Sequence, residues 1–178
     1  MAGSNLLQMP DVRLTGCFPE LSGFVLLDPR RLEDAVPQAK GRDLMTLLCT
    51  SDLGNRVTAD GVAILMLNLT VGYYTVTVGD RRSLARPAGA VASTGWVLGT
   101  DTGTLLLCGA GYLTEWDPEH EKHRPISVSP GWYRLDIDGY PLGADSDDDY
   151  ALDLTLTPAA ERPPFAADLA QDFSLDDG

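Results

Sequence analysis

Two stretches of this chain repeat each other, and the repeat limits what the chain can fold into. Residues 67–78 read LNLTVGYYTVTV, and residues 126–137, 59 positions later, read ISVSPGWYRLDI. Gly72 aligns with Gly131, and both stretches have a tyrosine two positions after that glycine. Repeated units that each expose an apolar face bury it against one another. The spacing therefore predicts two related units that pack together.

A second pair of blocks has the same offset. The sequence Leu-Leu-Cys at 47–49 recurs at 106–108. The run 44–50 is apolar, is short for a helix, and is followed by turn-forming residues, so it predicts a core strand. Residues 104–108 begin the second copy in the same way. The predicted repeat units are about 44–98 and 103–157.

Other short segments also have strand patterns. The run FVLL at 24–27 lies between Gly23 and Pro29, as expected of a buried strand. Segments 73–78, 132–137 and 150–156 alternate in polarity, which places one face on a core and the other in water. The sequence thus predicts an all-β fold, an antiparallel β-sandwich built from two tandem related β units with few short helices.

The length of 178 residues fits a single domain over 1–178. The tail at 159–178 is rich in Ala, Pro and acids, and a short docked helix is expected at 165–173. The first residues do not resemble a signal peptide, and no apolar run approaches the roughly 20 residues of a membrane helix. We therefore expect a cytoplasmic protein.

The charge is uneven along the chain. Residues 1–89 hold nine Lys/Arg and nine Asp/Glu, whereas residues 90–178 hold four and seventeen. The second half therefore carries the whole net charge of −13. Such a charge argues against direct binding of nucleic acid, whose phosphates require a basic face. It fits either a solubilising surface or an acidic surface that attracts a basic partner.

The segment 145–149, Asp-Ser-Asp-Asp-Asp, is the densest acidic run. Its alternating carboxylates resemble the opening of a calcium loop, but Tyr150 stands where such a loop has its glycine. A solvated hairpin loop and an acidic contact surface are the other interpretations.

Few residues suggest catalysis or metal binding. Both histidines, His120 and His123, lie in one charged loop, and two ligands are fewer than a zinc site normally uses. The cysteines at 49 and 108 fall in apolar runs, where a thiol is inert, and Cys17 makes an odd number. We expect no cofactor, no metal site and no catalytic residue.

Aromatic residues gather at the two repeated junctions. Tyr74 and Tyr133 fall on the apolar side of their strands and are expected in the core. Tyr73 and Trp132 fall on the other side, where an exposed aromatic ring could anchor a partner or a ligand. The alternative is that both rings cover sheet edges.

The second copy resembles the competence protein J type of nuclease inhibitor. The resemblance lies in an alternating strand, Pro-Gly-x-Tyr at 130–133, a second alternating strand, an acid-rich loop and a Tyr-led closing strand. The residues that carry it are Ile126, Val128, Pro130, Gly131, Tyr133, Leu135, Ile137, Asp149, Tyr150, Leu152 and Leu154. It implies a small bacterial β-sandwich that inhibits a nuclease by binding it.

The sequence therefore favours a non-enzymatic bacterial interaction protein, an inhibitor or immunity-like factor that binds a basic protein such as a nuclease through its acidic second half. A small-ligand or carbohydrate-binding β module and a hydrolase with a carboxylate or metal site are the alternatives. The predicted partner-binding residues are Trp132, Arg134, Asp136, Asp145, Asp147, Asp148 and Asp149.

Overall fold

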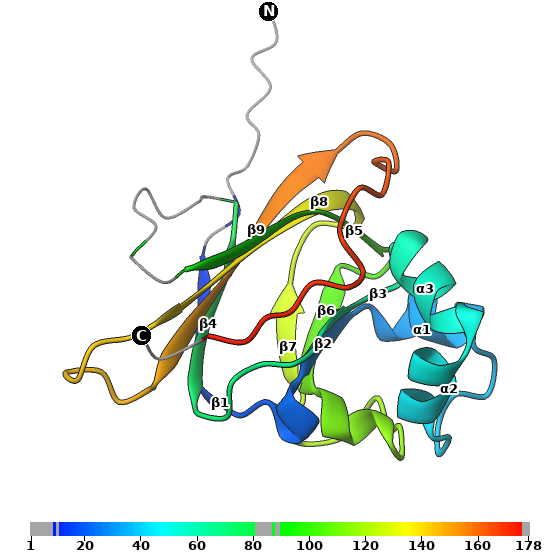
Figure 1. Cartoon of the computed structure of the whole chain (residues 1–178). Coiled ribbons are helices and arrows are strands. Elements are labelled where there is room, and N and C mark those ends of the chain that lie inside the picture. Colours follow the sequence, from blue (N-terminus) through cyan, green and yellow to red (C-terminus); the bar gives the residue numbers. More distant parts are fainter. Residues whose placement is uncertain (1–8, 10, 81–86, 88–89, 176–178) are drawn as a thin grey trace, which may run out of the picture.

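The computed structural model describes residues 9, 11–80, 87 and 90–175 of the chain. Within these residues, nine strands form two sheets that face each other, and short helices lie on one side (Figure 1). This arrangement confirms the predicted all-β, sandwich-like fold. The basic cluster Arg81, Arg82 and Arg86 lies outside the described residues.

The two sheets differ in size. The five-stranded sheet has the order β1-β4-β9-β8-β5, and the four-stranded sheet has the order β3-β2-β6-β7. All neighbouring strands are antiparallel except β4 and β9, which are parallel. The larger sheet consists of β1 Val12–Cys17, β4 Tyr74–Gly79, β5 Val91–Thr100, β8 Gly131–Pro141 and β9 Tyr150–Ala159. The smaller sheet consists of β2 Phe24–Leu27, β3 Ala63–Met66, β6 Thr104–Gly109 and β7 Arg124–Ser127.

An apolar core lies between the sheets, and β8 shows how the sequence builds it. Tyr133, Leu135 and Ile137 are buried in this core. The residues between them, Arg134 and Asp136, lie on the other face of the strand and are more exposed. The alternation in the sequence thus places every second side chain of β8 in the core, as predicted.

A second apolar cluster fills the outer face of the four-stranded sheet. Helices α1 Pro29–Ala35, α2 Leu44–Thr50 and α3 Asp52–Ala59 lie on that side (Figure 1). Phe24 and Leu26 belong to the core between the sheets, whereas Val25 and Leu27 pack with the helices. Both faces of this sheet are covered, so four consecutive apolar residues suit β2. Within the described residues, no helix is long and apolar enough to cross a lipid bilayer.

The prediction of a core strand at 44–50 was wrong, because this segment is helix α2. Asp43 caps the helix by accepting hydrogen bonds from the Thr46 N–H at 3.0 Å and the Thr46 hydroxyl at 2.7 Å. Leu44 and Leu48, one turn apart, are the buried residues of the helix. An apolar run of this length suits either structure, and the capping residue before it favours the helix.

The strand pairing nevertheless repeats along the chain. β1 pairs with β4 and β2 with β3, and later β5 pairs with β8 and β6 with β7. β2 and β6 pair with each other at the centre of the four-stranded sheet. In this pattern the counterpart of β6 is β2. The proposed match between the Leu-Leu-Cys blocks at 47–49 and 106–108 is therefore wrong, since one is helical and the other is a strand.

The tail after β9 runs across the molecule back toward the start of β4 (red in Figure 1). The helix predicted at 165–173 is absent from this described segment, which is extended apart from a turn at 169–170. The Phe173 ring lies 6.2 Å from that of Trp96 in the core, and Leu175 is also buried. The Leu175 N–H donates to the Thr70 hydroxyl at 2.8 Å, which fastens the tail beside β4.

Candidate protein-binding site

The predicted site residues fall into two groups, one along β8 and one in the loop after it. Trp132 and Arg134 lie in the first half of the strand and Asp136 is its middle residue, whereas the acidic run 145–149 lies in the loop beyond its far end. The strand has 11 residues. At roughly 3.3 Å per residue, the two ends are about 30 Å apart. The structure therefore does not bring the two groups together.

Trp132 is half-buried against the end of the sheet. Its ring packs so closely on Gly61 and Gly99 that a Cβ at either glycine would lie less than 3 Å from it. The guanidinium carbon of Arg31 lies 4.6 Å from the centre of the ring on which it stacks. A cation over an indole face is a favourable contact, and it covers part of the ring.

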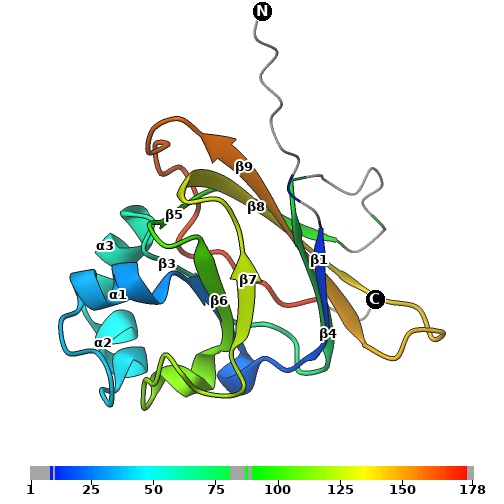
Figure 2. The same cartoon turned by 180° about the vertical axis from the view of Figure 1, so that it is seen from behind.

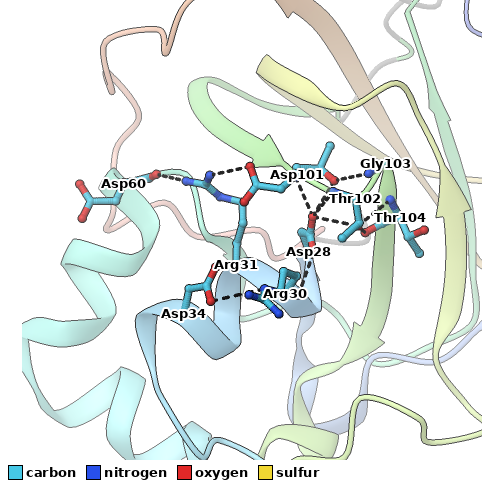
Figure 3. A network of polar contacts seen from close by, with 10 residues as sticks. Asp28, Arg30, Arg31, Asp34, Asp60, Asp101, Thr102, Gly103 and Thr104 are labelled. Atoms are coloured by element: carbon cyan, nitrogen blue, oxygen red, sulfur yellow. Dashed lines mark hydrogen bonds and ion pairs between the residues drawn. The ribbon is translucent and has the colours of Figure 1, made fainter.

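Arg31 belongs to a polar network around the buried carboxylate of Asp28 (Figure 3). Asp28 caps α1 by accepting from the Arg30 N–H at 2.8 Å, and it also accepts from the Thr100 hydroxyl at 2.6 Å and the Asp101 N–H at 3.0 Å. Burial alone would raise the pKa of this carboxyl, but the hydrogen bonds, those from Thr100 first, lower it overall. A buried acid can indicate catalysis; this one joins the start of α1 to the turn between β5 and β6.

The acidic loop is fixed by its last two carboxylates. Asp148 is buried, and its Oδ2 accepts from the Gly16 N–H at 3.0 Å and the Thr75 hydroxyl at 2.6 Å. Gly16 has a φ of +63° within the irregular part of β1, so Asp148 holds the bulge of that edge strand. Asp149 accepts from the Tyr73 N–H at 2.9 Å. The loop is thereby tied to β1 and to the start of β4.

These hydrogen bonds place exposed acids beside exposed apolar side chains. Asp145 and Asp147 are exposed at the tip of the loop, and Asp149 is exposed apart from its bond to Tyr73. Tyr73 is 52% exposed, and its ring lies 5.4 Å from that of Phe18, which is 39% exposed. Both rings therefore lie next to the acidic loop, on the end of the molecule where β1 and β4 meet (Figure 1).

Two aliphatic side chains extend this area. Leu21 is 62% exposed and Val71 is 69% exposed. Their loops are joined by the Leu69 N–H, which donates to the carbonyl oxygen of Ser22 at 2.9 Å. We define the end surface as Phe18, Leu21, Val71 and Tyr73 together with Asp145, Asp147 and Asp149.

The backbone that presents Leu21 is strained. Leu21 and Ser22 have φ values of 53° and 54°, in the left-handed region that residues with a Cβ rarely adopt. Such strain persists only where the surrounding structure imposes it, and it concentrates at functional sites. Here it keeps an apolar side chain in solvent.

A pocket of about 380 Å³ opens beside the end surface. It is lined by residues of β1, β6 and the approach to β7, and β1 and β7 are edge strands of the two sheets (Figure 2). Phe18 and Tyr73 belong both to this pocket and to the end surface. The buried residues of its lining, which form its floor, are Cys17, Phe24, Leu107, Cys108 and Gly109. We call this cavity the edge pocket.

The two histidines lie near this pocket and pack on aromatic rings. His123 is buried and stacks on Trp116 with the ring centres 5.2 Å apart, while the His120 ring lies 4.6 Å from that of Tyr112. His123 Nε2 donates to the Asp117 carbonyl oxygen at 2.7 Å. Burial lowers the pKa of His123. No group of three His, Cys, Asp or Glu side chains among the described residues could hold a metal ion.

The thiols differ in environment. Cys17 and Cys108 are buried, and burial raises the pKa of each, which disfavours the reactive thiolate. Cys49 is exposed on α2, contrary to the expectation of a buried strand thiol. A buried thiolate nucleophile thus has no support at Cys17 or Cys108.

Comparisons with known proteins give only distant likenesses. The chain matches no protein-family model and no curated protein sequence. One similar solved structure is described as "Crocagin biosynthetic gene J", with 14% identity, a TM-score of 0.45, and coverage of 83% of this chain and 96% of that one. Another is ComJ from Bacillus subtilis, an inhibitor of the DNA-degrading activity of NucA, with 11% identity, a TM-score of 0.40, and coverage of 84% and 97%. At these values no residue of either protein is matched to one here.

Sequence reasoning singled out Tyr73 and the acidic loop but missed Phe18, Leu21 and Val71. Two of these stand directly before turn-forming residues, Phe18 before a proline and Val71 before a glycine. A large apolar residue at a turn has little chance to reach a core, because turns run over the surface. That pattern is the signal that could have found them.

Proposed function

We propose that this chain is a non-enzymatic protein that binds and inhibits a basic protein, and that the end surface is its contact site. The observation that carries the proposal is the gathering of exposed apolar side chains beside exposed acids. Among the described residues, five large apolar side chains are exposed, and four of them belong to the end surface. The fifth, Leu169, lies in the tail.

The apolar part of the end surface has the composition of a binding centre. Contiguous exposed apolar area is uncommon on a protein that acts alone, and it marks contact sites for partners. Tyrosine is among the residues that most often dominate binding energy. Tyr73 is held by backbone hydrogen bonds to Asp149, so its ring is presented by a fixed main chain.

The acidic part of the end surface indicates that the partner is positively charged. Asp149 accepts a hydrogen bond from Tyr73, and Asp145 and Asp147 are exposed in the same loop, on a chain whose net charge is −13. A complementary positive surface would be steered toward this end and would dock in a defined orientation. Trp132 and Arg134 lie toward the other end of β8 and Asp136 at its middle, and the proposed contact site does not include them.

A nuclease is the basic partner that we propose. A nuclease must present a positive face to the phosphates of its substrate. An acidic surface with an apolar centre can occupy such a face and exclude the nucleic acid. The resemblance of residues 126–154 to the competence protein J type of inhibitor implies the same class of partner.

The proposal is tested with the full chain as bait and three variants. Wild type, Tyr73→Ala, the double variant Asp145→Asn/Asp147→Asn and Leu169→Ala are immobilised and exposed to lysate of the source cell. Proteins retained by wild type are identified and purified, and their dissociation constants for wild type and each variant are measured by calorimetry at several salt concentrations.

We expect Tyr73→Ala to weaken binding by about tenfold, as for an anchor at an interface centre. The double variant should flatten the dependence of affinity on salt, because it removes charges at the rim. The retained protein should be a nuclease that the wild-type chain inhibits. Binding that is insensitive to salt and to all three variants would contradict the proposal.

A further inference from the structure

We propose that the edge pocket receives one aromatic side chain of the protein partner. The inference rests on the proposed function and identifies a second, uncharged contact of the same partner. In this proposal the shape of the pocket selects the partner, and the charge of the acidic loop attracts it.

The position of the pocket is the first argument. Phe18 and Tyr73 form part of its lining and also part of the end surface. A partner seated on these rings therefore covers the mouth of the pocket. An interface over an empty pocket would leave the exposed faces of these rings without contact inside the cavity, whereas an inserted side chain packs on them.

The lining is the second argument. The pocket is lined by four aromatic residues, Phe18, Phe24, Tyr73 and Tyr112, and Leu107 adds to its floor. Aromatic rings attract another ring in offset or edge-on geometry beyond the effect of buried area alone. Its volume of about 380 Å³ falls within the range of pockets that hold small organic groups.

The charges around the pocket are the third argument. Two acids, Glu20 and Glu121, and two bases, Lys122 and Arg124, line it. The formal charge of the lining is thus balanced, and the Arg124 guanidinium already donates to the carbonyl oxygen of Thr15 at 3.3 Å. A charged side chain in the pocket would meet a like charge as well as an opposite one. An uncharged aromatic group avoids that repulsion.

The end surface and the edge pocket therefore recognise different chemistry. Asp145 and Asp147 offer charge without a cavity, whereas the pocket offers a cavity without net charge. Changes at residues that belong to only one of them, such as Asp145 or Tyr112, should leave the property that depends on the other unaltered. This separation makes the inference testable apart from the proposed function.

The pocket is tested first with p-cresol, the side chain of tyrosine, as a probe in a nuclear magnetic resonance titration of the full chain. Its saturated analogue, 4-methylcyclohexanol, is the matched control ligand. We expect p-cresol to shift amide signals of residues 16–18 and 107–112 and to bind about fivefold more tightly than the analogue. Equal binding of the two probes, or shifts confined to other regions, would overturn the inference.

Variants then connect the pocket to the partner. Tyr112→Ala should weaken p-cresol binding about fivefold, whereas Tyr112→Phe, which keeps the ring, should leave it close to wild type. Asp145→Asn/Asp147→Asn should bind p-cresol as wild type does. Thermal unfolding of each variant verifies that the fold is kept.

With the captured partner, Tyr112→Ala should reduce affinity about tenfold without changing the salt dependence, and saturating p-cresol should compete. If Tyr112→Ala and p-cresol leave partner affinity unchanged, the inference fails while the end surface stands. If binding depends on neither salt nor Tyr73, the proposed function itself fails.

Discussion

The two halves of the molecule use the same strand pairing but have different additions. The first half pairs β1 with β4 and β2 with β3, and the second pairs β5 with β8 and β6 with β7. Between β2 and β3 the first half has three helices, whereas between β6 and β7 the second has a short 3-10 helix at Ala110–Leu113 and the histidine loop. The second half also adds β9, the acidic loop before it and the tail. The shared strands form the scaffold, and the additions are what differ in chemistry.

At equivalent positions of the repeat, the neighbouring elements determine how exposed an aromatic side chain is. Tyr73 and Trp132 stand directly before the matched tyrosines Tyr74 and Tyr133. Tyr73 is more than half exposed beside the acidic loop, whereas Trp132 is packed on two glycines beneath Arg31. Arg31 comes from α1, an addition of the first half that covers the second. The two rings are equivalent as sequence patterns, and Tyr73 is the more exposed of the two.

Among the contacts between the two halves, we expect those of the Asp28 carboxylate to contribute most to stability. This carboxylate follows β2 of the first half and accepts hydrogen bonds from the β5–β6 turn of the second. Asp28→Ala should lower the free energy of unfolding by about 3 kcal/mol, because it leaves buried donors unpaired. Urea unfolding measures the change. Asp101→Ala, at an exposed carboxylate of the same turn, is the control with a much smaller effect.

The same carboxylate gives this contact a pH dependence. The folded-state pKa of Asp28 lies below its ordinary value. Its stabilising contribution is therefore present above the unfolded-state pKa and is lost as pH falls through the folded-state pKa. The difference in stability between wild type and Asp28→Asn should shrink in that acidic range. A difference that stays constant down to the lowest pH at which the protein folds would show that the charge of Asp28 contributes nothing.

The matched aromatic pair gives the next largest effect. Trp132→Ala should lower the free energy of unfolding by about 2 kcal/mol, because it removes packing on the sheet end and the contact with Arg31. Tyr73→Ala should change stability by less than about 0.5 kcal/mol, as for an exposed side chain. Urea unfolding of both variants makes the comparison. Equal losses would mean that Tyr73 is part of the scaffold and not a free anchor.

The fold class was predictable from the sequence because period-two alternation is the pattern of a strand, although the face of β4 and β9 that was expected in water is also largely buried. Segments 73–78, 132–137 and 150–156 match β4, β8 and β9 closely. The strand prediction for residues 44–50 was wrong for a physical reason, since the periodicity of a seven-residue apolar run does not distinguish a buried strand from a helix. The capping pattern Asp43-x-x-Thr46 is the stronger signal and favours the helix. The predicted first unit begins at residue 44 and therefore omits β2, which is the counterpart of β6 in the strand pairing.

The candidate site was only partly predictable, because it depends on which loops meet in space. The acidic run 145–149 was visible in the sequence, but its carboxylates have different roles. Asp148 is buried beneath the loop and holds β1, while Asp145 and Asp147 remain exposed. No local pattern distinguishes these acids, since Gly16 and Thr75, the partners of Asp148, lie more than 70 residues away from it in the chain.

The smallest predicted effect tests whether the shared scaffold is energetically equivalent in the two halves. The Tyr74 hydroxyl donates to the carbonyl oxygen of Thr70 at 2.9 Å, and the Tyr133 hydroxyl donates to that of Ser129 at 2.5 Å. Each bond spans four residues and closes the turn before its strand. Tyr74→Phe and Tyr133→Phe should each cost about 1 kcal/mol, the usual contribution of a neutral hydrogen bond.

The double variant tests whether the two tyrosine hydrogen bonds stabilise both halves in the same way. The two tyrosines lie on strands separated by β9, so their effects should add. Urea unfolding of wild type, both single variants and the double variant measures this directly. If one substitution lowers the free energy of unfolding clearly and the other hardly changes it, the two halves have the same hydrogen-bond geometry but the bond stabilises only one of them. Equal and additive losses would mean that the Gly-x-Tyr pattern stabilises its turn in both halves, which leaves the end surface and the edge pocket free to differ.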